Sequence, residues 1–182
     1  MKYRERAFTL LEVMITIAIL AIIAMFALSS NKNLSESNRA ESFLQELKRN
    51  FMFARAKATT ADDFVVICAA PEAAIAARTS FTCANDWVAN QVVVFVDING
   101  DLSFDAATDT IYRVMEKLPN QDKLALSPNS SGFRFDTSGL LNNAQATAFV
   151  YCPNTDNSNN RELNLTLGGT VLYRGSTTAT CG

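Results

Sequence analysis

The sequence contains no histidine. This absence excludes imidazole as a general base, as a member of a catalytic triad and as a metal ligand. No two cysteines are separated by two residues, so neither a redox dithiol nor a zinc ribbon is indicated. The chain also lacks a large excess of one charge, since its net charge is -2 and its pI is near 5.2. This charge gives no general attraction to nucleic acid. No nucleophile has a nearby candidate base, so we expect no enzymatic activity and no cofactor.

The four cysteines, Cys68, Cys83, Cys152 and Cys181, all follow an apolar N-terminal run. An even number of cysteines beyond a membrane segment is typical of disulfides in an oxidising compartment. Four cysteines allow three connectivities, and loop length favours Cys68 with Cys83 and Cys152 with Cys181. Each bridge would stabilise the domain by about 3 kcal/mol. The alternative is four reduced, buried thiols in a cytosolic fold.

The apolar run extends from Phe8 to Leu28, and its only charged residue is Glu12. As a helix it would be about 31 Å long and could cross a hydrocarbon core. Basic residues precede the run, so the positive-inside rule places the N-terminus in the cytoplasm and the remainder outside. We therefore predict a transmembrane helix over residues 8–29. Ala27-Leu28-Ser29 is a poor match for a secretory cleavage site.

The stretch "RAFTLLEV" resembles the class III signal of type IV pilins and type II secretion pseudopilins. The resemblance implies a leader, residues 1–7, that a prepilin peptidase removes between Ala7 and Phe8, after which Phe8 is N-methylated. Family members usually have Gly before the cut, and Ala7 predicts slower processing at most.

The resemblance also assigns a role to Glu12, the fifth residue of the mature chain. A carboxylate within a bilayer costs about 2.5 to 3.5 kcal/mol on insertion scales, and such residues usually have a partner. The implied partner is the free amine of a neighbouring subunit's Phe8, so Glu12 would set the axial register of assembly. The alternative is a simple signal anchor in which Glu12 reaches the headgroups.

Residues 30–60 contain neither proline nor glycine, and apolar residues recur there at spacings near three and four. The spacing predicts one helix from about Phe8 to Thr60, whose second half, 30–60, lays an apolar stripe on a sheet. The predicted stripe consists of Leu34, Phe43, Leu44, Leu47, Phe51, Ala54 and Ala58.

Short β-rich runs separated by turn residues follow from residue 61 to 182. Gly168-Gly169 predicts a tight hairpin turn, and Asp136–Gly139 a second turn. The predicted class is α+β, a helix packed on a mostly antiparallel β-sheet head. The pilin resemblance implies the type IV pilin fold. The predicted strands are residues 64–69, 92–96, 111–114, 133–135, 148–152, 163–167 and 170–173.

The order of several motifs resembles the GspH/FimT-like branch of minor pilins and pseudopilins. These are a strand ending in Cys ("VVIC"), Trp87 followed by "VFVDINGD", the turn "FRFDTSG", a second strand ending in Cys, and a final hairpin. Together with the leader, the resemblance covers nearly the whole chain.

The acidic loop "DINGDLSFDAATD" has EF-hand-like spacing, but Leu102 stands where Gly is required and Thr108 where a bidentate Glu belongs. A hairpin turn at Asn99-Gly100 accounts for the loop without a metal. We interpret Trp87 as a packed aromatic beside the Cys83 bridge rather than a ligand platform. The polar segment 152–160 is predicted to be an exposed loop and a candidate partner surface.

The leading hypothesis is a minor pilin held in the inner membrane with its head in the periplasm and then assembled into the priming or tip complex of a type IV pilus at the cell surface. Its implied partners are other minor pilins, the major pilin, the peptidase and methyltransferase, and the platform protein. One alternative is a pseudopilin of a type II secretion system. Another is a pilin that captures DNA, but Thr170 and Leu172 stand where DNA-binding members carry arginines, and only Arg174 is nearby.

Overall fold

The computed structural model describes residues 8–142, 145–156 and 158–181, and the side chains of all of these except 26–32. Contacts within the chain divide it into two compact units, residues 1–36 and 37–182. We describe each by itself. The predicted leader residue Ala7 lies outside the described residues.

The described part of the first unit is helical and contributes the start of α1, which extends from Leu10 to Ala61. The observed ends are within two residues of the predicted ones. The large apolar side chains from Phe8 to Met25 are 49% to 80% exposed. Leu34, which we predicted in the buried stripe, is 61% exposed. The prediction for Leu34 is wrong, because the buried stripe begins further along the helix.

The second unit is an α+β domain, which confirms the predicted class. One antiparallel sheet has the order β5-β3-β1-β7, another has the order β10-β9-β8-β6, and β2 pairs with β4. The elements of the head are β1 Val65–Ala70, α2 Glu72–Ala77, β2 Phe81–Thr82, β3 Gln91–Val96, β4 Ser103–Phe104, β5 Thr110–Met115, β6 Lys123–Ser127, β7 Gly132–Phe135, β8 Thr147–Cys152, β9 Arg161–Leu165 and β10 Val171–Ser176.

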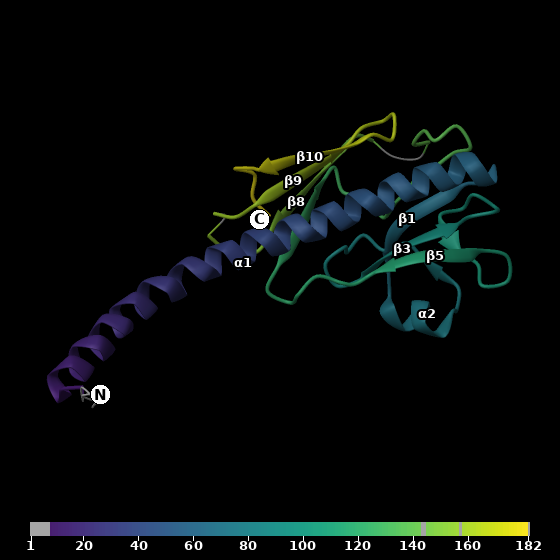
Figure 1. Cartoon of the computed structure of the whole chain (residues 1–182). Coiled ribbons are helices and arrows are strands. Elements are labelled where there is room, and N and C mark those ends of the chain that lie inside the picture. Colours follow the sequence, from purple (N-terminus) through teal and green to yellow (C-terminus); the bar gives the residue numbers. More distant parts are fainter. Residues whose placement is uncertain (1–7, 143–144, 157, 182) are drawn as a thin grey trace, which may run out of the picture. The chain divides into compact units, whose positions relative to one another are not determined.

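The main core lies between residues 37–61 of α1 and both four-stranded sheets (Figure 1). Leu44, Leu47 and Phe51 are fully buried at helical spacing. The ring of Phe51 meets Phe133, Phe135 and Phe149 with centroids 5.4 to 6.4 Å apart. One helix thus closes two sheets because its apolar face has aromatic partners on each.

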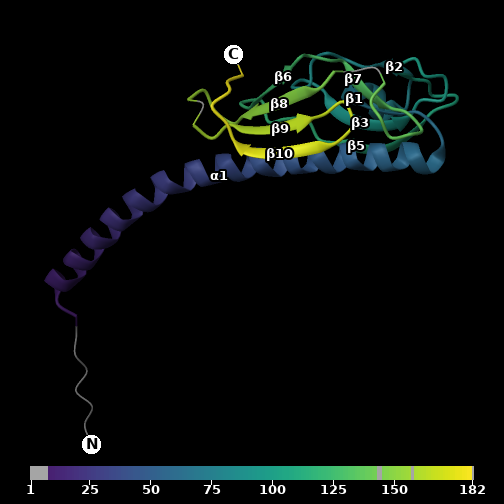
Figure 2. The ribbon, with the colours of Figure 1, turned by 90° about the horizontal axis from the view of Figure 1, so that it is seen from above.

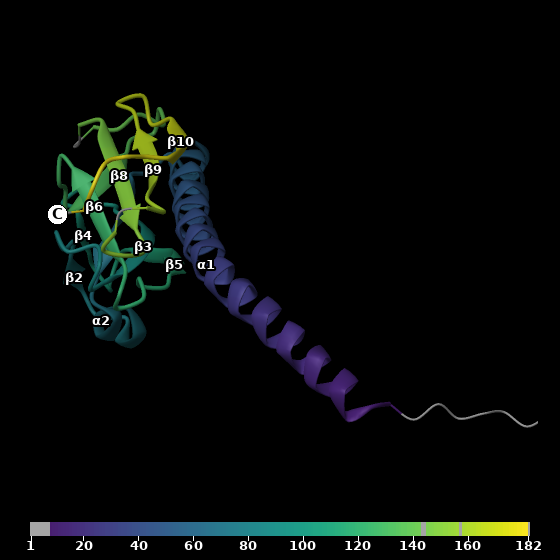
Figure 3. The same cartoon turned by 90° about the vertical axis from the view of Figure 1, so that its left-hand side faces the viewer.

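A second core lies on the opposite face of the first sheet, under α2, β2 and β4 (Figure 3). It includes alternate residues of β1 and β3, whose other residues face α1. Both strands are therefore buried on both faces, which explains their unbroken apolar runs.

The sequence-based assignment missed α2, β2, β4 and β6. Two-residue strands carry no periodicity, and α2 has a single buried side chain, Ile75. The strand β6 buries a single side chain, Leu124, and its burial does not alternate along the strand. The link between β3 and β5 is also more than a simple hairpin turn, because β4 lies within it.

Candidate functional site

The N-terminal motif forms the first turn of α1. The Thr9 hydroxyl oxygen accepts the backbone N–H of Glu12 at 3.2 Å, as a helix N-cap does. The spacing Thr-x-x-Glu is that of a capping box, and a carboxylate is favoured at this positive end of the helix. This capping contact is additional to the two roles considered for Glu12 from the sequence, although the capping spacing is readable there. Phe8, the predicted first residue of the mature chain, is 78% exposed.

Within the described part of the chain, no helix combines the length and the apolar character needed to cross a membrane.

A buried ionic cluster fastens the beginning of the head's helix to the second sheet. The Arg39 guanidinium donates two hydrogen bonds to Asp122, with Nε–Oδ2 2.6 Å and Nη2–Oδ1 2.9 Å. The side chain of Asp122 is fully buried, whereas that of Arg39 is 28% exposed. The Tyr151 hydroxyl, on β8, donates to the same carboxylate. We did not predict this cluster, because its members are 83 and 29 residues apart in sequence.

Two groups of the cluster, Arg39 and Tyr151, have a raised pKa. The hydrogen bond to Asp122 raises the pKa of the Arg39 guanidinium. Burial, followed by the hydrogen bond to Asp122, raises the pKa of the Tyr151 hydroxyl well above its ordinary value. The Arg39 guanidinium therefore stays charged and the Tyr151 hydroxyl stays neutral over the physiological range.

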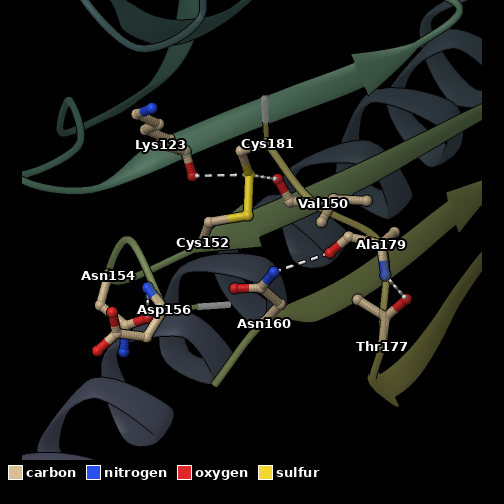
Figure 4. The surroundings of a disulfide bond; sticks show 9 residues. All are labelled: Lys123, Val150, Cys152, Asn154, Asp156, Asn160, Thr177, Ala179 and Cys181. Carbon is tan, nitrogen blue, oxygen red and sulfur yellow. Dashed lines mark hydrogen bonds between the residues drawn. A yellow bond between two sulfur atoms is a disulfide. The ribbon is translucent and has the colours of Figure 1, made fainter. Parts of the chain in front are cut away.

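The disulfide Cys152–Cys181 lies beside this cluster and ties the C-terminal tail to β8 (Figure 4). Cys181 Sγ is 3.3 Å from the Val150 carbonyl oxygen. The side-chain amide of Asn160 donates to the Ala179 carbonyl at 2.8 Å, which fixes the tail a second time. In the predicted loop 152–160, residues 155, 156 and 158 are exposed, whereas Pro153 and Asn160 are buried.

The other bridge, Cys68–Cys83, joins β1 to the segment after β2. Both pairs are the ones that loop length favours. A side chain at Gly132 on β7 would meet Cys68 Cβ at 2.9 Å and Cys83 Sγ at 3.3 Å, so the bridge packs directly on that strand.

Two glycine turns pack on α1 at the far end of the head. Gly139 (φ +74°) closes the turn predicted after β7, and Gly169 (φ +73°) closes the predicted β9–β10 hairpin. A Cβ at Gly139 would lie 2.9 Å from Thr59 and 3.3 Å from Arg55, and one at Gly169 would lie 2.8 Å from the Gly139 carbonyl oxygen. Glycine is favoured at both positions because φ is positive, and because a Cβ would press on α1 side chains at Gly139 and on the Gly139 backbone at Gly169.

A groove of about 480 Å³ runs between α1 and this hairpin, and we call it the α1–hairpin groove. Figure 2 shows the C-terminal hairpin strand β10 beside residues 37–61 of α1. Met52, 55% exposed, and Ala56 supply apolar surface, while Lys48 and Arg55 supply two cations. The groove is lined by Lys48, Met52, Arg55, Ala56, Thr59, Ser138, Gly169, Thr170 and Val171.

The acidic loop between β3 and β5 uses its carboxylates as backbone caps. Asp97, fully buried, accepts the N–H groups of Gly100, Asp101 and Leu102. Asp109 accepts those of Ile98 and Asp105. Among the described residues no group of three or more acidic or cysteine side chains could hold a metal ion. The loop's EF-hand-like spacing is thus explained by capping.

Trp87 is packed, as we interpreted it. It is 2% exposed, its indole N–H donates to the Ser130 carbonyl at 2.8 Å, and its ring contacts Phe133 and Phe149.

Comparisons with known proteins identify the class of proteins to which this N-terminal motif and this fold belong. Residues 2–28 match the prokaryotic N-terminal methylation motif, and residues 44–170 match the model of type II transport protein GspH. A methylation motif followed by a helix packed on antiparallel sheets defines the type IV pilin and pseudopilin class. The chain belongs to the GspH family within that class, which confirms the family resemblance seen in its motifs.

The solved structures agree in fold. Two crystal forms of the type IV minor pilin FimU of Pseudomonas aeruginosa are similar to this chain, with TM-scores of 0.59 and 0.56 and sequence identities of 17% and 18%. They cover 79% and 75% of this chain, and the matches span 93% of each FimU chain. A comparison with curated proteins gives no match. The predicted type IV pilin fold is confirmed.

Proposed function

We propose that this chain is a minor pilin, a subunit of the complex that primes or tips a type IV pilus. The observation that carries the proposal is the union in one chain of a methylation motif (2–28) and a GspH-type head (44–170). The head is a packed structural domain, and its polar residues cap loops and fasten elements. Its partners would be the major pilin, other minor pilins and the assembly platform.

The N-terminal segment would anchor the chain before assembly. Residues 8–28 contain one charged residue, and their described large apolar side chains are exposed and thus available to lipid or to neighbouring helices. A prepilin peptidase would cut between Ala7 and Phe8, and methylation would follow on Phe8. The amine of a neighbour's Phe8 would neutralise Glu12 and set the subunit's axial position.

Deletion of the gene in its own bacterium tests the proposal. Surface pili and twitching should fall, and the full-length gene should restore them. Intact mass spectrometry of the envelope protein should show loss of the seven-residue leader, a methyl group and two oxidised cysteine pairs. Normal piliation with impaired export of secreted proteins would contradict the pilus assignment and favour a type II secretion pseudopilin.

DNA capture is the second candidate, because Lys48 and Arg55 of the α1–hairpin groove lie beside Thr170. Two groove cations neutralise few phosphates, whereas DNA affinity rises with each phosphate contact. Removing the leader also takes away more basic than acidic residues. In a gel-shift assay at low salt we expect weak binding, and tight, salt-sensitive binding would reverse this ranking.

A further inference from the structure

We infer that the α1–hairpin groove is a subunit-docking site for a protein segment that presents an apolar side chain flanked by two carboxylates. The inference rests on the proposed function, since it names a contact that an assembled pilin would make. It starts from the groove's charge: among the described residues, neither Lys48 nor Arg55 forms an ion pair. Both cations are therefore available to carboxylates from another molecule.

The distance between Lys48 and Arg55 restricts which protein segment can bind in the groove. Lys48 and Arg55 are seven residues apart on one helix, which corresponds to about 10.5 Å along its axis. Met52 lies between them and is 55% exposed, and Ala56 lies one residue beyond Arg55. The matching surface has two acidic groups about as far apart, with an apolar side chain between them.

The apolar floor favours protein over nucleic acid. Protein interfaces place apolar side chains, with Met and Arg enriched, inside a polar rim. Nucleic-acid sites instead cluster Lys and Arg along the phosphate backbone. Exposed apolar residues also gather nearby, because Leu140 (46%) and Leu167 (59%) belong to the two glycine turns that build this end of the head.

The required chemistry exists in this chain itself. In the acidic loop the partly exposed Leu102 lies between Asp101, which is exposed, and Asp105, which is partly exposed. A partner subunit with such a loop would fit the groove.

Site-specific photocrosslinking of the full chain in its own bacterium tests the inference. Benzoylphenylalanine at position 52 should give a crosslinked protein product, and peptide mapping should place the partner's end at an apolar residue flanked by carboxylates. Lys48→Glu with Arg55→Glu should reduce the product at least tenfold. Arg49→Glu, an exposed cation on the same helix outside the groove, should leave it unchanged, and position 114, also exposed, should not give this product.

A crosslink to residues 97–109 of a second copy would support the same docking chemistry. A nuclease-sensitive product, a partner segment without carboxylates, an unchanged yield after charge reversal, or no product would each overturn it. Surface pili are scored in parallel. If the chain with an unaltered groove gives no crosslink although its pili contain the subunit, the docking site alone is overturned. If pili form normally without the subunit, the proposed function is overturned.

Discussion

The two parts of α1 are apolar for different reasons. From Phe8 to Met25 the large apolar side chains are exposed on all faces, with one carboxylate in the first turn. In residues 37–61 the apolar residues follow helical spacing, and those on one face are fully buried against two sheets. Uniform apolarity is what a helix needs in an apolar medium, whereas a stripe is what it needs on a core. Substitutions in the first part should therefore leave the folding of the head intact, whereas substitutions in the buried stripe of the second part should destabilise it.

The largest effect is expected at Glu12. Glu12→Gln removes the charge that a neighbour's N-terminal amine would neutralise, so incorporation into pili should fall by more than tenfold. Immunoblotting of sheared pili and of membranes measures this, with the head's urea-unfolding midpoint unchanged. Glu12→Asp is the control that keeps the charge. Equal incorporation of the Gln variant and the wild type would remove the proposed ionic contact.

Phe51→Ala, unlike Glu12→Gln, should lower the stability of the head. The ring is fully buried and contacts three phenylalanines from both sheets, so its loss should cost about 3 to 5 kcal/mol of unfolding free energy. Urea denaturation of the detergent-solubilised chain measures the loss. Met52→Ala, at the neighbouring exposed position, should change stability by less than about 1 kcal/mol. Similar losses in the two variants would mean that the stripe is not what holds the helix on the head.

Asp122→Asn should destabilise the head by about 2 to 3 kcal/mol. Breaking a buried ion pair typically costs about 3 to 5 kcal/mol, and the partly exposed Arg39 retains some hydration. The matched control is Lys117→Ala, since the exposed Lys117–Glu72 pair, 3.8 Å apart, should contribute less than about 1 kcal/mol. Hydrogen exchange should show the added opening at residues 37–47 first. Uniform loss of protection along the helix would contradict a local fastening.

Local patterns were enough to predict some parts of the molecule. The helix, seven strands and both glycine turns could be read from the sequence because each depends on neighbours within a few residues. The N-terminal motif was readable for the same reason. Loop length favoured the disulfide pairs that the structure contains.

The remaining features depend on contacts distant in sequence. The Arg39–Asp122–Tyr151 cluster and the α1–hairpin groove bring together residues of α1 and residues at least 79 positions later in the chain. No repeating pattern in the sequence predicts contacts between residues so far apart. In the acidic loop the sequence favoured a turn over a metal site, but it did not predict which backbone N–H groups Asp97 and Asp109 cap.

The smallest effect concerns pH and the Tyr151 hydroxyl. Burial raises its pKa in the folded head, so the folded state holds the proton more tightly than the unfolded chain does. The resulting stability is complete below about pH 10, the ordinary pKa of tyrosine, and is lost as the pH rises above it. Tyr151→Phe should lose about 1 kcal/mol at pH 7 with its hydrogen bond to Asp122, and its stability should then decline less between about pH 9.5 and 11 than that of the wild type. Unfolding midpoints measured across this range test the prediction, with the half-buried Tyr112→Phe as the control. Parallel alkaline profiles for Tyr151→Phe and the wild type would show that this hydroxyl does not govern the loss.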